Sequence, residues 1–99
     1  MKMTFKLSLL AALVASSGLV AAQQVVKIGH VGPVSGAIAH LGKDNENGAR
    51  LAIEELNAKG LKIGGQAVKF ELVAEDDAGD PKQGTAAAQK LVDSKVNGV

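Results

Sequence analysis

A strand pattern followed by a helix pattern opens the part of the chain after residue 22. Residues 25–31 are rich in β-branched side chains and end at Gly32 and Pro33, which predicts a buried parallel strand that leads into a loop. From about Leu41 to Lys59, small and apolar residues recur at helical spacing. The predicted inward stripe consists of Gly48, Ala49, Ala52, Ile53 and Leu56. The sequence therefore predicts a first strand–helix unit.

A hairpin and a second strand are predicted next. Gly64 and Gly65 separate residues 61–63 from residues 66–75, and two glycines supply the positive φ angles of a two-residue hairpin turn. From Val68 to Glu75, mostly apolar positions alternate with mostly charged ones, which is the period of a strand.

A second helix follows this strand. Asp80 is the predicted N-cap, Pro81 occupies the first helical position, and Gln83 can complete a capping box. The helix is expected to reach about Val96, with Val99 beginning another strand. Its predicted buried residues are Gly84, Ala87, Ala88, Leu91, Val92 and Val96. Alternation of strands and helices predicts an α/β fold, a parallel sheet with flanking helices. A chain that stops on entering a strand is interpreted as the N-terminal piece of a longer sequence.

Residues 1–22 have the order of a secretory signal peptide. Lys2 and Lys6 precede an apolar run, and Val20 and Ala22 fit the −3 and −1 positions of a cleavage site before Gln23. The alternative is a membrane anchor, but residues 7–20 are shorter than the roughly 20 apolar residues that a spanning helix needs. The chain lacks cysteine, so no lipid can be attached through an N-terminal Cys. We therefore expect export through the Sec route to a Gram-negative periplasm.

Removal of the signal peptide changes the net charge. Without Lys2 and Lys6, nine of the 11 basic residues remain against ten acidic ones, so the formal charge falls from +1 to −1. A strongly basic surface for nucleic acid or anionic lipid is thereby excluded.

Catalytic motifs are absent from the sequence. Ser35 lies in no nucleophile elbow, and His30 and His40 have no third metal ligand at a recognisable spacing. The glycines after the first strand lack dinucleotide-binding spacing, and Pro33 removes a backbone N–H that a phosphate would need. No enzymatic activity, metal or cofactor is expected.

The loops after the two strands are the candidate sites, because ligands of open parallel sheets bind beyond the carboxyl ends of the strands. Ser35 in the first loop offers a hydroxyl group. In the second loop, Asp76, Asp77 and Asp80 resemble a calcium loop only weakly, because Pro81 and Lys82 break the ligand pattern. Turn formation and helix capping are the favoured roles of these three aspartates.

Several motifs in combination resemble one known family. They are residues 26–36, 42–44, 47–52, 55–60, 76–77 with 80–81, and 88–92, after a signal peptide. The chain resembles the N-terminal part of the periplasmic leucine/isoleucine/valine-binding protein family, the type I solute-binding proteins of branched-chain amino-acid ABC importers. The resemblance covers essentially all of residues 1–99.

The resemblance implies a type I periplasmic binding protein fold, with residues 23–99 forming the first part of lobe one of a truncated leucine-binding-protein-like domain. Most ligand-gripping groups of the family would follow Val99. Binding members often carry an aromatic residue at the position of Leu41, where it touches the ligand. Leu41 would keep the wall of the ligand pocket apolar but change its shape. Leu41, together with Ser35 in the first loop, is therefore a candidate ligand-binding residue.

The function implied is capture of branched-chain or other apolar amino acids for an inner-membrane ABC permease, by a protein that is a monomer when full length. The alternative is a ligand-sensing receptor domain of the same fold. A third interpretation, an enzyme of flavodoxin-like or nucleotide-binding type, is disfavoured by the secretory signal and the missing phosphate loop.

Overall fold

A computed structural model of the chain describes residues 23–99, and the predicted signal peptide lies outside them. The elements run in the order β1 (Gln24–Gly32), α2 (Ala39–Ala58), β2 (Lys62–Ile63), β3 (Gln66–Asp76) and α3 (Pro81–Asp93). The predicted order of elements is confirmed, with α2 beginning two residues earlier than expected. None of the helices in this part of the chain is long and apolar enough to cross a membrane.

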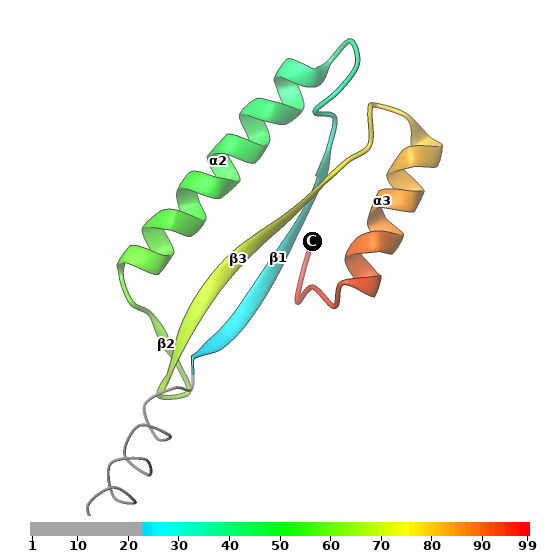
Figure 1. The fold of residues 1–99 in the computed structure, drawn as a ribbon. Helices are drawn as coiled ribbons and strands as arrows, with labels where there is room; N and C mark the ends of the chain where they lie inside the picture. Colours follow the sequence, from blue (N-terminus) through cyan, green and yellow to red (C-terminus); the bar gives the residue numbers. More distant parts are fainter. Residues whose placement is uncertain (1–22) are drawn as a thin grey trace, which may run out of the picture.

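The sheet is mixed. β1 and β3 pair in parallel, with Ile28 opposite Leu72, and β2 pairs with β3 as an antiparallel hairpin. Gly64 and Gly65 form the hairpin turn with φ angles of 60° and 78°, as predicted. The helices α2 and α3 lie on opposite sides of the β1–β3 pair (Figure 1). The two strands thus form the middle layer of an α/β arrangement.

The end of the chain returns to the other edge of β1. The Gly29 N–H donates to the Gly98 carbonyl at 2.7 Å, and the Asn97 N–H donates to the Lys27 carbonyl at 2.8 Å. Ile28 and Gly98 form a parallel bridge, so residues just before Val99 begin a second parallel pairing, as expected. α3 ends at Asp93 rather than near Val96, because Lys95 takes a left-handed φ of 57° that turns the chain toward β1.

Three hydrophobic side chains are buried among residues 23–99, namely Val68, Ala87 and Leu91. Leu91 reaches Gly29, where an added Cβ would lie 2.9 Å from its Cδ1 atom. Two positions predicted to be buried in α3 are instead exposed, Ala88 and Val92, because each lies one position round the helix from the buried Ala87 and Leu91. The core contact between α3 and the sheet is therefore narrow.

The inward stripe of α2 is also displaced from the prediction. Gly48 and Ala52 are exposed, whereas the covered positions recur as Gly42, Glu46, Ala49, Ile53, Leu56 and Asn57. Gly42 and Asn57, near the two ends of the helix, both contact backbone, and these contacts set the rotation of α2 over the sheet.

Asn57 extends the hydrogen-bond ladder of β3. Its amide nitrogen donates to the Phe70 carbonyl at 2.8 Å, and its Oδ1 accepts from the Phe70 N–H at 2.8 Å. Both groups are partly buried, and they lie on the edge of β3 away from β1. The sequence indicated only that Asn57 belongs to a helix stop, and it held no signal for this pairing.

Replacing Asn57 should measurably destabilise the lobe. Asn57→Ala leaves the Phe70 N–H and carbonyl without their partner, and we expect a loss of about 1–3 kcal/mol in the free energy of unfolding, measured by urea titration. Asn47→Ala, at an exposed position of the same helix, is the control and should change stability by less than about 0.5 kcal/mol. Equal effects of the two substitutions would contradict a bridging role.

Candidate ligand site at the carboxyl ends of the strands

Two loops meet at the carboxyl ends of β1 and β3 (Figure 1). The first comprises residues 33–38 and leads into α2, and the second comprises residues 77–80 and leads into α3. The Asp77 N–H donates to the Gly32 carbonyl at 3.2 Å. Parallel pairing of β1 with β3 brings these two loops together, as the sequence predicted.

The loops also pack against each other. A Cβ on Gly79 would lie 3.3 Å from Cδ1 of Ile38, and one on Gly36 would lie 3.4 Å from the Ala78 carbonyl oxygen. Gly36, Ala78 and Gly79 all have positive φ angles, of 83°, 51° and 70°. Glycine adopts this conformation without strain, so residues 36 and 79 suit the close approach of the loops.

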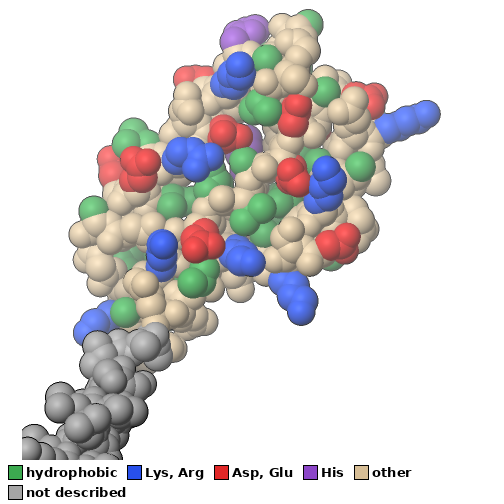
Figure 2. All heavy atoms as spheres, in the orientation of Figure 1, with side chains coloured by type: hydrophobic (Ala, Val, Ile, Leu, Met, Phe, Trp, Pro, Cys, Tyr) green, Lys and Arg blue, Asp and Glu red, His purple; other side chains and the backbone are tan. Residues whose placement is uncertain are grey.

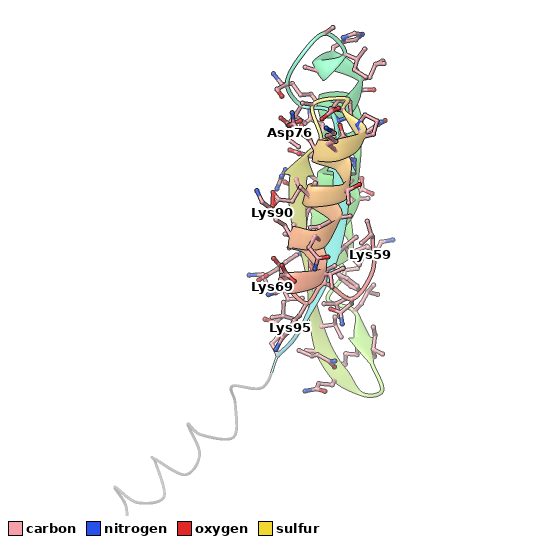
Figure 3. The ribbon with its side chains drawn as sticks, turned by 90° about the vertical axis from the view of Figure 1, so that its right-hand side faces the viewer. Lys59, Lys69, Asp76, Lys90 and Lys95 are labelled. Carbon is pink, nitrogen blue, oxygen red and sulfur yellow. The ribbon has the colours of Figure 1, made fainter. Side chains whose placement is uncertain are left out.

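Asp76 joins the two loops through its carboxylate. Oδ1 accepts hydrogen bonds from the Val34 and Ala78 N–H groups, both at 2.9 Å, and Oδ2 accepts one from the Ser35 hydroxyl at 2.5 Å. Figure 3 shows Asp76 at the end of the sheet where the loops lie. A single side chain at the last position of β3 thus holds both sides of the connection.

These hydrogen bonds favour the ionised carboxylate. The Ser35 hydroxyl, followed by the Val34 and Ala78 N–H groups, lowers the pKa of Asp76 from 3.8 to about 2. Because the folded-state pKa is depressed, the stabilisation is complete above the ordinary value of 3.8 and is lost as the pH falls through about 2. Asp76 therefore remains charged throughout the neutral and mildly acidic range.

The other two aspartates have local structural roles. Asp77 Oδ1 accepts from the Gly79 N–H at 2.8 Å, which forms an Asx turn. Asp80 Oδ2 accepts from the Gln83 N–H at 3.3 Å and caps α3, while the Asp80 N–H donates to the Asp77 carbonyl. The favoured interpretation of turn and cap is confirmed. Residues 23–99 contain no group of three side chains placed to hold a metal ion.

The two candidate ligand residues lie on the first loop and the helix that follows it. Ser35 is exposed and donates its hydroxyl proton to Asp76, which leaves the oxygen lone pairs available to a donor. Leu41 lies in the first turn of α2 and is 54% exposed. Gly42 beside it is buried against the backbone of Pro33. Both candidates thus stand at the accessible edge of the sheet.

The histidines lie near this end of the molecule without forming a site. His30 occupies β1, and its ring lies over Gly32, where an added Cβ would be 3.0 Å from Cε1. The Nδ1 atom of His30 is buried without a hydrogen-bond partner among the described residues. His40 is exposed in the first turn of α2.

Two hollows that touch the described sheet do not include the candidate residues in their lining. One of about 350 Å³ lies at the opposite end, lined by residues such as Gln23, Asn57 and Leu61. Another of about 230 Å³ lies between β3 and α3 and is lined by Glu75, Asp76 and Lys90, among others. Ser35 and Leu41 therefore form an open surface that would need a second wall to enclose a ligand.

Acidic and basic side chains are interspersed on the face that Figure 2 shows. That face therefore carries no patch of a single charge that would suggest a second binding site. One ion pair joins Arg50 to Glu46 at 3.4 Å on α2, within the part of the chain described.

The sequence profile of the periplasmic binding protein family matches residues 25–99. The chain belongs to this family. The match begins inside β1 and includes both loops and both helices, so it covers the whole strand–helix framework of the candidate site. The type I periplasmic binding protein fold expected from the sequence is confirmed.

Relatives within the periplasmic binding protein family are similar over most of this chain. It is 45% identical to the Leu/Ile/Val-binding protein BraC3 of Rhizobium johnstonii, over 91% of this chain and 24% of the relative. It is 41% identical to the leucine-, isoleucine-, valine-, threonine- and alanine-binding protein of Pseudomonas aeruginosa, over 96% of this chain and 26% of the relative. The chain thus spans about a quarter of the length of these relatives.

Solved structures of the family share the arrangement of elements. The substrate-binding protein LivJ of the Streptococcus pneumoniae branched-chain amino acid transporter, in complex with isoleucine, superposes with a TM-score of 0.65 and 34% identity. The superposition covers 74% of this chain and 20% of LivJ. A solute-binding protein from Rhodopseudomonas palustris, in complex with 3,4-dihydroxybenzoic acid, superposes with a TM-score of 0.59 and 34% identity over 74% of this chain and 19% of that one.

The sequence identified the two loops but missed the way in which they are joined. Asp76 was recognised as a turn residue, and its reach to Val34 and Ser35 was not. The available signal was the position of an aspartate at the last residue of a parallel strand. Such a side chain lies beside the loop of the neighbouring strand.

Proposed function

We propose that this chain is the N-terminal part of the extracytoplasmic solute-binding subunit of an ABC-type importer, which captures branched-chain or other apolar amino acids. The observation that carries the proposal is the 45% identity to a Leu/Ile/Val-binding protein over 91% of the chain. The role is binding, without chemistry. A membrane permease would receive the bound amino acid.

The open geometry of the site supports capture between two lobes. Ser35 and Leu41 are exposed at the carboxyl edge of the sheet. Related chains are about four times as long, which leaves ample sequence for a second lobe and for the remaining strands of the first. In this proposal, residues 97–99 continue as the third parallel strand beside β1. The groups that grip the ligand's carboxylate and ammonium lie mostly after Val99.

A second ligand class is favoured by one observation. The Rhodopseudomonas palustris protein is as similar in sequence as LivJ, and it holds an aromatic carboxylic acid rather than an amino acid. A small aromatic acid therefore belongs in the ligand panel as the competing candidate. Discrimination between the two classes depends on whether the site contains a partner for an ammonium group.

Leu41 provides the test of the proposed pocket. In the protein expressed from its complete reading frame, Leu41→Asp should weaken amino-acid binding by about 1–3 kcal/mol, through lost apolar contact and a misplaced charge. Isothermal titration calorimetry with leucine, valine, phenylalanine and 3,4-dihydroxybenzoate measures the affinities. The wild type should bind the apolar amino acids with little discrimination among them. The reason is that the Leu41 side chain at the pocket wall fits the shape of a ligand less closely than an aromatic ring would.

Leu51→Asp is the matched control for Leu41→Asp. Leu51 lies further along the same helix and is 57% exposed, against 54% for Leu41. The control should bind leucine as the wild type does. Equal affinities of the wild type and Leu41→Asp would remove Leu41 from the site.

Export and processing are also proposed. In a Gram-negative host the chain should appear in the periplasm, with Gln23 as its first residue, because Val20 and Ala22 are small. Intact-mass and peptide mass spectrometry are preferred to Edman sequencing, because an N-terminal glutamine cyclises with loss of ammonia and then blocks Edman chemistry. Retention of Met1 in a membrane fraction would overturn this proposal.

A further inference from the structure

Asp76 makes contacts that a turn residue does not need. A turn within residues 77–80 is already closed by the Asp77 carboxylate and the Asp80 N–H. Asp76 adds hydrogen bonds to Val34 and Ser35, which lie 42 and 41 positions away in the sequence. Its exposed carboxylate is therefore directed at the connection between β1 and α2.

The connection that Asp76 holds leads directly to Leu41. Val34 and Ser35 are followed by Gly36, whose carbonyl accepts from the Ala39 N–H at 3.3 Å, and the Ile38 carbonyl accepts from the Leu41 N–H at 3.0 Å. On the other side, Pro33 packs against the backbone of Gly42. Leu41 thus lies between two fixed points. The loop before it is held by Asp76, and Gly42 after it packs against Pro33 at the start of the same loop.

We infer that Asp76 is a positioning residue, which fixes the loop of residues 33–38 and thereby places Leu41 at the ligand. The inference rests on the proposed function for the identity of the ligand. In this inference Asp76 acts through the loop, because its carboxylate oxygens accept hydrogen bonds from Val34, Ser35 and Ala78.

The charge and the geometry of Asp76 can be separated by substitution. Asp76→Asn keeps an Oδ1 that can accept from Val34 and Ala78, and its amide nitrogen can donate to the Ser35 oxygen with that hydrogen bond reversed. Asp76→Ala removes all three hydrogen bonds. A positioning role therefore predicts that the asparagine rescues most of what the alanine loses.

Asp80→Ala is the matched control in the same loop. Asp80 also accepts a backbone N–H through an exposed carboxylate contact, but its partner Gln83 belongs to α3 rather than to the β1–α2 loop. Loss of this cap should lower the melting temperature. It should leave Leu41 and the ligand affinity unchanged.

The experiment combines calorimetric titration of leucine with hydrogen exchange, on the protein expressed from its complete reading frame. We expect Asp76→Ala to bind about tenfold more weakly than the wild type, Asp76→Asn to remain within about threefold, and Asp80→Ala to match the wild type. Of these three variants, only Asp76→Ala should exchange the backbone amide protons of residues 34–38 faster than the wild type. Wild-type affinity in Asp76→Ala, or an asparagine variant as weak as the alanine variant, would overturn the inference.

Two further arms keep the outcome decisive. Should Asp76→Ala fail to fold, Ser35→Ala removes one of the hydrogen bonds to Asp76 and should raise exchange at residues 35–38. Unchanged exchange there would overturn the inference. If the wild type binds no compound in the panel, the proposed function fails. Exchange at residues 34–38 still decides whether Asp76 fixes the loop.

Discussion

Gly42→Ala should destabilise the lobe more than any other substitution that adds one methyl group to α2. A Cβ at this position would lie 1.7 Å from the Pro33 carbonyl oxygen and 2.4 Å from its carbon. Both atoms belong to backbone and cannot rotate away, so the start of α2 or the end of β1 must shift. We expect a loss at or above the upper end of the roughly 1–3 kcal/mol usual for overpacked cores.

Gly48→Ala, a second glycine-to-alanine change in the same helix, should have the opposite sign. Gly48 is exposed, and a Cβ there meets no atom within 4 Å. Alanine has the higher helix propensity, so this variant should gain about 0.5–1 kcal/mol. Urea unfolding of both variants in the complete protein measures the difference. Similar stabilities of the two variants would show that α2 does not approach Pro33 closely.

Residues 23–99 on their own should lack a cooperative thermal transition. Only Val68, Ala87 and Leu91 are buried hydrophobic side chains in this part of the chain, and none of them is aromatic. Eight large hydrophobic residues are exposed there, among them Val25, Ile38, Leu51 and Val92. Parallel strands need both faces covered, and domains of this size are marginal even when their cores are complete.

Differential scanning calorimetry of the isolated segment measures this directly. The expected trace has no sharp endotherm, whereas the protein expressed from its complete reading frame should show one under the same conditions. A cooperative endotherm from residues 23–99 alone would contradict the idea that the segment depends on further strands and helices for its core.

Local signals in the sequence were enough to predict the elements of the fold. The glycine pair at residues 64 and 65, the cap at Asp80 and the alternation along residues 68–75 each specify geometry through nearby residues, and all three predictions are confirmed. The rotation of α2 was mispredicted because small residues such as Gly48 and Ala52 fit either an inward or an outward face. Contact between Gly42 and Pro33 decided that rotation.

In the candidate site, too, the location could be predicted from the sequence, whereas the contacts between elements could not. Its location followed from the rule that parallel sheets bind ligands beyond their carboxyl ends, and the two loops indeed meet there. The links between the loops did not follow, because Asp76 and Asn57 reach partners on other elements whose distance depends on the assembled sheet. Periodicity and capping rules describe only neighbours along the chain.

Calorimetric titration of the protein expressed from its complete reading frame, against leucine, isoleucine, valine and 3,4-dihydroxybenzoate, tests the central claim most directly. Extracytoplasmic capture of apolar amino acids predicts saturable one-to-one binding of the branched-chain amino acids and weaker binding of the aromatic acid. Binding of the aromatic acid alone, or of none of the four compounds, would contradict the account.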